Sequence, residues 1–213
     1  MKPATLYVDF VSPYAYLAMK RLDEVSDRLD VEIKPVLFAG LLNHWENKGP
    51  AEIPPKRIHT FRTVRWYADK HGIDYRMPPH HPFNPLRALR LAIALGSTRE
   101  VVGTIFDQIW WHGQLPDDAG GWATIQEALA LTDGDALTAA PAVKDQLRAN
   151  GEAALAEGVF GVPTFVVDGE GFWGVDSMDM LIDWLDGRLD LADAEAQRIL
   201  TIKPSAERPG SKS

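Results

Sequence analysis

Cysteine is absent from this sequence of 213 residues, and its absence narrows the chemistry of the protein. It excludes structural disulfides, thiolate metal sites and a cysteine nucleophile, so any thiol chemistry needs a thiol that a ligand brings. No stretch approaches the roughly 18 apolar residues of a membrane span. Lysine and arginine form no block, and the net charge is −8. We therefore expect a cytoplasmic protein that binds neither nucleic acid nor a membrane.

The chain starts with a strand that leads directly into a helix. Residues 5–10 are β-branched and aromatic, which is typical of a strand, and Asp9 is expected near the surface rather than as a base. Ser12 and Pro13 are the predicted N-cap and first helical residue, because the hydroxyl can accept from an unpaired amide and proline loses no hydrogen bond there. The helix is predicted over residues 13–28. Unpaired N–H groups and the positive end of the helix dipole meet at Ser12, so this place favours an anion.

The remaining elements indicate an α/β fold with a helical insertion. The composition, 46% hydrophobic and 24% charged, allows a full core in one domain or in one domain with an insertion. Residues 31–36 alternate like a strand, whereas residues 38–158 are almost continuously helical. A hairpin, a last amphipathic helix that ends at Gly187 and a short further helix are then predicted at residues 162–168 with 171–175, 176–187 and 189–202.

This order is that of a thioredoxin-like fold with a large all-helical insertion. We expect a thioredoxin-like domain of residues 1–37 and 159–202, an insertion domain of residues 38–158 with a core of its own, and a flexible tail of residues 203–213. Pro163 opens a strand where this fold places a cis peptide bond. A trans proline at the start of an edge strand is the alternative, and the order of elements favours cis.

Four stretches of the sequence resemble one enzyme family. They are residues 9–18 (DFVSPYAYLA), 47–50 (NKGP), 159–165 (VFGVPTF) and 172–181 (FWGVDSMDML). In these stretches the chain is similar to the 2-hydroxychromene-2-carboxylate isomerases, which belong with the kappa-class glutathione transferases in the DsbA-like branch of the thioredoxin fold. The resemblance covers nearly the whole chain before the tail. Its two end motifs are fairly specific in combination, whereas the insertion matches mainly by helical content.

The resemblance implies glutathione as the cofactor and Ser12 as the residue that binds its sulfur. DsbA-like oxidoreductases carry Cys-X-X-Cys at the helix start, where this chain has serine, proline, tyrosine and alanine at residues 12–15, so the protein itself cannot exchange disulfides. A hydroxyl that donates to a thiolate beside a helix N-terminus lowers the pKa of the thiol from about 8.5 toward neutrality. The nucleophile is then the thiolate of the ligand. The alternative is that Ser12 only caps the helix.

Two further glutathione contacts follow from the same resemblance. The backbone of Val162, next to Pro163, would pair with the cysteinyl backbone of the tripeptide. Asp176 and Ser177 would bind the γ-glutamyl end, the carboxylate taking the ammonium group and the helix N-terminus taking the carboxylate. A plain N-cap is the alternative role for Asp176.

Polar residues of the insertion complete the expected site. Asn47 and Lys56 resemble residues that reach glutathione in kappa-class proteins, although Lys56 fits a solvated lysine equally well. Asn43 stands where some isomerases have a substrate-binding lysine, and Asn84 either faces the cleft, which we favour, or fixes a loop. A substrate carboxylate therefore needs another cation, for which the sequence offers Arg57, Arg62 and Arg65. The pair at residues 80–81 does not indicate a metal site, because it lacks acidic or histidine ligands at helical spacing.

The function we expect is glutathione-dependent isomerisation of a small aromatic or otherwise electrophilic acid, an activity of aromatic degradation. By resemblance, the bound thiolate adds to the substrate and is expelled again, which regenerates glutathione. Kappa-class-like conjugation or peroxide reduction is an alternative within enzymes, and a redox-inactive thioredoxin-like binding module is an alternative outside them. The exposed helices of the insertion leave a homodimer open.

Overall fold

The computed structural model describes residues 1–206 and is built on a mixed four-stranded sheet. β1 (Lys2–Val8) runs parallel to β2 (Leu29–Pro35). β3 (Thr164–Val167) pairs antiparallel with β1 on one side and with β4 (Glu170–Trp173) on the other. The strand order is β2-β1-β3-β4, so strands from before and after the helical segment pair in one sheet. The predicted thioredoxin-like α/β architecture is confirmed.

α1 (Pro13–Lys20) is shorter than the helix that the sequence pattern predicts over residues 13–28. A helix to residue 28 would leave no chain for the turn into β2, because Arg28 already accepts a hydrogen bond from the Lys2 N–H (2.8 Å) and the next residue begins the strand. A short 3₁₀-helix, η1 (Leu22–Glu24), makes the connection instead. The apolar residues at helical spacing, Leu17, Leu22 and Val25, are nevertheless buried, since packing against the sheet does not require a continuous helix.

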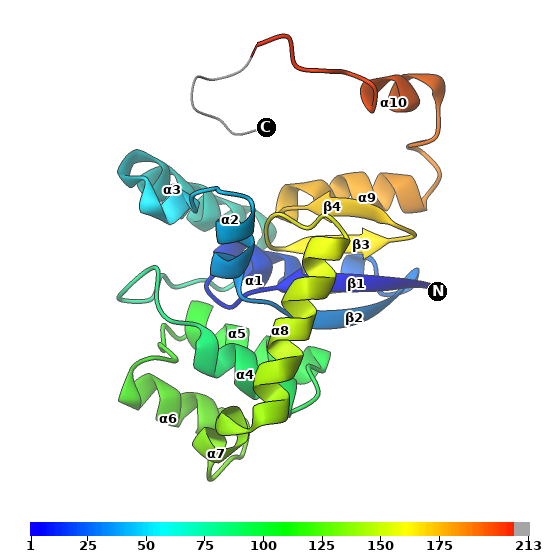
Figure 1. Cartoon of the computed structure of the whole chain (residues 1–213). Helices are drawn as coiled ribbons and strands as arrows, with labels where there is room; N and C mark the ends of the chain where they lie inside the picture. Colours follow the sequence, from blue (N-terminus) through cyan, green and yellow to red (C-terminus); the bar gives the residue numbers. More distant parts are fainter. Residues whose placement is uncertain (207–213) are drawn as a thin grey trace.

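Between β2 and β3 the described chain contains only helices and their connections, as predicted for residues 38–158. In Figure 1, α4 to α7 gather below the sheet and α8 rises from them to β3, while α3 lies at the upper left. The bounds are α2 (Phe38–His44), η2 (Pro50–Glu52), α3 (Pro54–His71), α4 (Leu86–Ala94), α5 (Arg99–Trp110), α6 (Ala119–Ala128), α7 (Gly134–Ala139) and α8 (Pro141–Ala156).

The insertion does not have a core of its own, so that expectation is wrong. One continuous cluster of buried side chains contains Leu6 and Val8 of β1 together with Val102 and Ile105 of α5. The rings of Phe10 and Phe106 lie 4.6 Å apart, centre to centre, across the boundary between the two parts. α4 and α5 thus cover the thioredoxin-like part as well as each other. The boundaries at residues 37 and 159 stay a prediction.

The C-terminal elements follow the predicted order. η3 (Val175–Ser177) leads into α9 (Met178–Leu185), and Gly187 follows it in the left-handed conformation (φ 72°) that commonly ends a helix. α10 (Ala194–Ile199) falls within the helix predicted at residues 189–202. Residues 203–206 have no regular structure, and the rest of the predicted tail, residues 207–213, lies outside the described residues. Within residues 1–206 no helix is long and apolar enough to cross a membrane.

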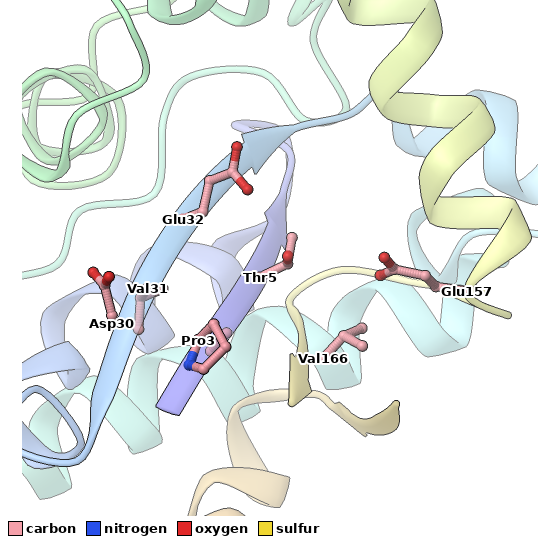
Figure 2. A pocket seen from close by; sticks show the side chains of 8 residues that line it. Pro3, Thr5, Asp30, Val31, Glu32, Glu157 and Val166 are labelled. Carbon is pink, nitrogen blue, oxygen red and sulfur yellow. The ribbon is translucent and has the colours of Figure 1, made fainter. Parts of the chain in front are cut away.

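α8 covers only part of its face of the sheet. Beyond its end, a hollow of about 420 Å³ opens over β1, β2 and β3, and Figure 2 shows Thr5 and Val166 on its floor with acidic side chains around them. Those acidic residues are Asp30, Glu32 and Glu157. The hollow lies over the first half of β1, whereas Ser12 follows the end of that strand, so the two are at opposite ends of the sheet.

Candidate functional site

Ser12 occupies the junction between β1 and α1, where its backbone is extended (φ −92°, ψ 112°). Its Oγ accepts a hydrogen bond from the Ala15 N–H (3.2 Å), and Pro13 is the first helical residue. The predicted N-cap is therefore confirmed. The side chain is only 8% exposed, so its hydroxyl is largely shielded from water while the start of α1 remains beside it.

The structure brings Val162 and Pro163 to Ser12 from the other end of the chain. Ser12 Oγ donates a hydrogen bond to the carbonyl oxygen of Val162 (3.2 Å), and the peptide bond between Val162 and Pro163 is cis. Strand pairing of β3 with β1 begins at Thr164, so Val162 lies just beyond the ladder. No acceptor among the described residues bonds the Val162 N–H. One backbone edge of Val162 is thus available to an extended ligand.

Asp176 and Ser177 lie at the entrance to α9, on the same side as the first turn of α1. Burial raises the pKa of Tyr14, and the negative charge of Asp176 raises it further, so Asp176 lies within electrostatic reach of the residue two positions after Ser12. Asp176 is exposed and is not the helix cap; Ser177 takes the N-cap position, and its hydroxyl donates to the Gly174 carbonyl (2.9 Å). Within residues 1–206 no hydrogen bond or ion pair engages the Asp176 carboxylate, which leaves it available to a cationic group.

Asp9 is fully buried, contrary to the expectation that it lies near the surface. Its carboxylate accepts from the Val11 N–H (3.0 Å) and from the Phe38 N–H (2.8 Å), and it thereby caps α2, whose own N-cap residue makes no side-chain hydrogen bond. Its backbone carbonyl accepts from the Ser12 N–H (3.0 Å). Burial raises the pKa of Asp9 to about 7, and the two backbone hydrogen bonds oppose the shift. Alternation along β1 could not reveal this role, because it depends on α2.

The buried Asp9 carboxyl should make stability pH-dependent. Its folded pKa lies above the unfolded value, so the native state binds the proton more tightly and the stabilisation falls as pH rises from about 4 to about 7, by up to about 1.4 kcal/mol per pH unit. Asp9→Asn should remove this pH dependence, so the wild type should lose stability relative to the variant between about pH 4 and about pH 7. Urea unfolding at several pH values measures it. Asp30→Asn, at an exposed aspartate, is the control, and equal pH profiles for wild type and Asp9→Asn would contradict the assignment.

Two side chains of the insertion hold the loop before Ser12 by its carbonyl groups. The indole N–H of Trp110 donates to the Phe10 carbonyl (2.9 Å), and Nε2 of His81 lies 2.8 Å from the Val11 carbonyl. Because a carbonyl only accepts, Nε2 carries a proton. Burial lowers the pKa of His81, the bond to Val11 opposes that shift, and the charge of Arg57 adds to it. The insertion therefore fixes the position of Ser12 rather than merely extending the fold.

The polar insertion residues expected at the site are all exposed, and within residues 1–206 no hydrogen bond or ion pair links them to Ser12. Asn43 is exposed on α2, and Lys56 is exposed in the first turn of α3. Asn47 accepts from the Lys48 N–H (2.8 Å). It lies two residues after Trp45, whose indole N–H donates to the Val159 carbonyl (3.1 Å) near the cis proline. Asn84 has the loop-fixing contact, since its Oδ1 accepts from the Leu86 N–H (3.0 Å) at the start of α4.

Tyr14 and His81 adjoin Ser12 or its loop but were not singled out from the sequence as binding residues. Tyr14 was detectable, because it lies two residues after the cap of a helix whose start the sequence already indicates. Arg57 was one of three arginines that the sequence could not separate. His81 carried no signal, because only the folded chain places it against Val11. No cluster of three or more metal-ligating side chains occurs in the part of the chain that the structure describes.

These groups together could hold glutathione. Val162 offers an N–H and a carbonyl to a peptide backbone, Ser12 and the start of α1 offer donors to a sulfur, and Asp176 offers a carboxylate to an ammonium group. Each group matches one functional part of the tripeptide. The chain supplies no competing thiol of its own.

Comparison with known proteins gives one family and two kinds of enzyme. Residues 5–186 match the model of the DSBA-like thioredoxin domain. The chain is 28% identical over 192 residues to a 2-hydroxychromene-2-carboxylate isomerase of Sphingobium xenophagum, with 86% of this chain and 98% of that protein covered. It is 25% identical over 206 residues to glutathione S-transferase kappa 2 of Caenorhabditis elegans, with 86% and 92% covered. A solved structure of a 2-hydroxychromene-2-carboxylate isomerase, 24% identical, matches the fold with a TM-score of 0.75 over 91% of this chain and 98% of that one.

Proposed function

The protein belongs to the DSBA-like thioredoxin domain family, and we propose that it is a glutathione-dependent isomerase that acts on a small aromatic, electrophilic acid. One observation carries the proposal. Ser12, at the start of α1, contacts Val162 beside the cis proline, in a chain that has no cysteine. A thioredoxin-fold site without its own sulfur can still perform thiol chemistry when a ligand brings the thiol. The isomerase and transferase names of the relatives support this choice.

Each site residue has a defined task in this proposal. Ser12 donates a hydrogen bond from its hydroxyl to the sulfur, and the start of α1 adds a favourable field, so both stabilise the charged form of the thiol. Val162 holds the peptide backbone in register, and Asp176 binds the ammonium group of the γ-glutamyl end. Bound glutathione would supply a nucleophilic thiolate that the reaction returns unchanged. The loop held by Asp9, Trp110 and His81 keeps Ser12 in place, which supports reaction by proximity.

Arg57 is the best placed of the three arginines to bind a substrate carboxylate. Arg65 is already paired with Asp69 (2.8 Å), whereas residues 1–206 provide no ion pair for Arg57 or Arg62. Phe61, one turn after Arg57 on α3, packs edge-on against His81, with 5.4 Å between the ring centres. His81 in turn contacts Val11, so this face of α3 is directed at the loop before Ser12. Arg62 is displaced around the helix from that face.

Arg57→Ala should therefore weaken the use of an acidic substrate. A charge-assisted hydrogen bond of about 1.5–3 kcal/mol corresponds to a loss of about 10- to 100-fold in kcat/KM. Arg62→Ala, on the same helix, should change kcat/KM by less than about twofold. Steady-state kinetics with the acid and with its methyl ester measures the effect, because the ester should not respond to Arg57→Ala. Equal losses in the two variants would assign the carboxylate to another cation.

A reaction with 2-hydroxychromene-2-carboxylate and a small amount of glutathione tests the proposed activity. We expect many turnovers per glutathione, with the amount of free thiol unchanged at the end. Consumption of glutathione in proportion to product would instead identify a transferase, to which the kappa-class relative points. Turnover of a peroxide with formation of oxidised glutathione would identify a peroxidase. Binding of peptides without any binding of glutathione would leave a redox-inactive binding module.

A further inference from the structure

Ser12 has one hydroxyl proton, and the structure directs it to the carbonyl oxygen of Val162. The hydroxyl donates to the Val162 carbonyl (3.2 Å), while its lone pair accepts from the Ala15 N–H (3.2 Å). Both hydrogen bonds are buried, and Ser12 is 8% exposed. A thiolate that approaches Ser12 must therefore compete with the Val162 carbonyl for that proton.

The Val162 carbonyl has no other donor to replace Ser12. Val162 is 6% exposed and lies outside the strand ladder, and the Ser12 hydroxyl is the one donor that residues 1–206 direct at its carbonyl oxygen. If the hydroxyl turned toward a sulfur with nothing in its place, a buried carbonyl would lose its hydrogen bond. The cost of such an unpaired group opposes the turn.

We infer that the Val162 carbonyl retains the Ser12 hydroxyl proton in its hydrogen bond, an arrangement that we call the latch. Only a thiol with a neighbouring amide N–H releases this proton. The ligand's N–H takes over the Val162 carbonyl, and the Ser12 O–H then turns to the sulfur. No covalent bond of the protein changes: one O–H···O contact is exchanged for an N–H···O and an O–H···S⁻ contact, and the proton of the thiol passes to water. This inference rests on the proposed use of glutathione and states which part of the tripeptide activates the thiol.

The latch makes the site selective for N-acylated cysteine over small thiols. A thiol without the amide has to leave either the carbonyl without a donor or the sulfur without the Ser12 hydroxyl. Glutathione satisfies both, because its cysteinyl N–H and its sulfur are separated by only two carbon atoms. We therefore expect the acidity of the bound thiol to depend on a group that does not touch the sulfur. Simple recognition of the backbone by Val162 would not produce that dependence.

Two ester analogues of glutathione distinguish the latch from simple recognition of the ligand backbone by Val162. In the first, an oxygen replaces the γ-glutamyl-cysteinyl N–H, which removes the donor without adding bulk. In the second, the same replacement at the cysteinyl-glycine amide is the matched control. Ultraviolet absorbance of the thiolate against pH gives the thiol pKa of each bound analogue, and calorimetry gives its Kd. The protein contributes no thiolate signal, because it has no cysteine.

With the wild-type protein, the control analogue should resemble glutathione. The first analogue should bind about 10- to 100-fold more weakly and keep a thiol pKa near the free value of about 8.5. In Ser12→Ala the two analogues should have the same thiol pKa, because no hydroxyl remains to be released. If the wild type lowers the thiol pKa of both analogues equally, the latch is wrong although glutathione use stands. If glutathione itself gives no saturable signal, the proposed function fails and the latch with it.

Discussion

Replacing Ser12 by alanine is expected to reduce glutathione-dependent turnover by about 10²- to 10³-fold, the effect typical of losing one preorganised donor to a developing or bound anion. The N-terminus of α1 would remain, so some stabilisation of the thiolate should persist. The loss should appear mainly in kcat, because binding of the tripeptide also uses Val162 and Asp176. The bound thiol should at the same time become less acidic, since the hydroxyl no longer favours its charged form.

Ser26→Ala is the matched control for this experiment. Ser26 is exposed, and its hydroxyl donates to the Asp23 carbonyl (3.0 Å) far along the chain from the start of α1. Turnover in Ser26→Ala should equal that of the wild type. Loss of the Ser12 cap also costs stability, by about 1 kcal/mol, so circular dichroism and the melting temperature should be recorded for both variants. Unchanged glutathione-dependent turnover in folded Ser12→Ala would refute the role of Ser12.

Arg21→Ala is expected to give the largest loss of stability among the arginines that form ion pairs. Arg21 ends α1, is 6% exposed, and binds Glu24 (2.7 Å) and Asp179 (2.7 Å). It also donates to the hydroxyl of Tyr67 on α3 and to the Val175 carbonyl (3.4 Å). One side chain thus joins α1, α3 and the start of α9. The hydrogen bonds raise the pKa of Arg21, so its charge is retained throughout the working pH range.

We expect Arg21→Ala to lower the free energy of unfolding by about 2–3 kcal/mol, which for a chain of this size corresponds to roughly 5–10 °C in melting temperature. The estimate stays below the value for a fully buried ion pair, because the Asp179 side chain is 80% exposed and can be hydrated when Arg21 is lost. Arg148→Ala on α8 is the control, since that arginine is 70% exposed and its pairs should contribute less than about 1 kcal/mol. Similar melting temperatures for the two variants would contradict a bridging role for Arg21.

The same substitution should weaken glutathione binding without touching the ligand. Arg21 fixes Val175 and Asp179, and Asp176 lies between them. If this segment positions the γ-glutamyl site, Arg21→Ala should raise the Kd for glutathione more than the Kd for N-acetylcysteine, which lacks that end. Calorimetry at a temperature where the variant is folded measures both. An equal rise for the two ligands would show that Arg21 acts on stability alone.

The parts of the fold that were predictable from sequence are those set by local patterns. The Ser12-Pro13 helix start, the hairpin at residues 162–175 and the glycine after α9 each depend on a few neighbouring residues, and the structure confirms them. The length of α1 was not predictable in this way. Apolar residues continue at helical spacing beyond Lys20, but the chain has to turn there to bring Leu29 beside Lys2.

The parts of the site that the sequence missed depend on packing between distant segments. Asp9 reads as an exposed interruption of a strand until α2 places the Phe38 N–H against it. His81 reads as one of two histidines in a proline-rich turn until its ring meets Val11. The expectation that the insertion has a core of its own was wrong for the same reason. Phe106 and Trp110 of α5 pack directly against the loop before Ser12. Family resemblance supplied the pairing of Ser12 with Val162, which no local pattern contains.

The central claim is that Ser12 and the start of α1 hold a thiolate that belongs to a ligand, and one measurement tests it most directly. Glutathione at about pH 7 is only a few per cent thiolate in free solution, and the protein adds no thiol of its own. Titrating glutathione with the protein while recording the ultraviolet absorbance of the thiolate should give an increase that saturates near one thiolate per chain and is largely lost in Ser12→Ala. An absorbance equal to the sum of the separate solutions at every ratio would contradict the account.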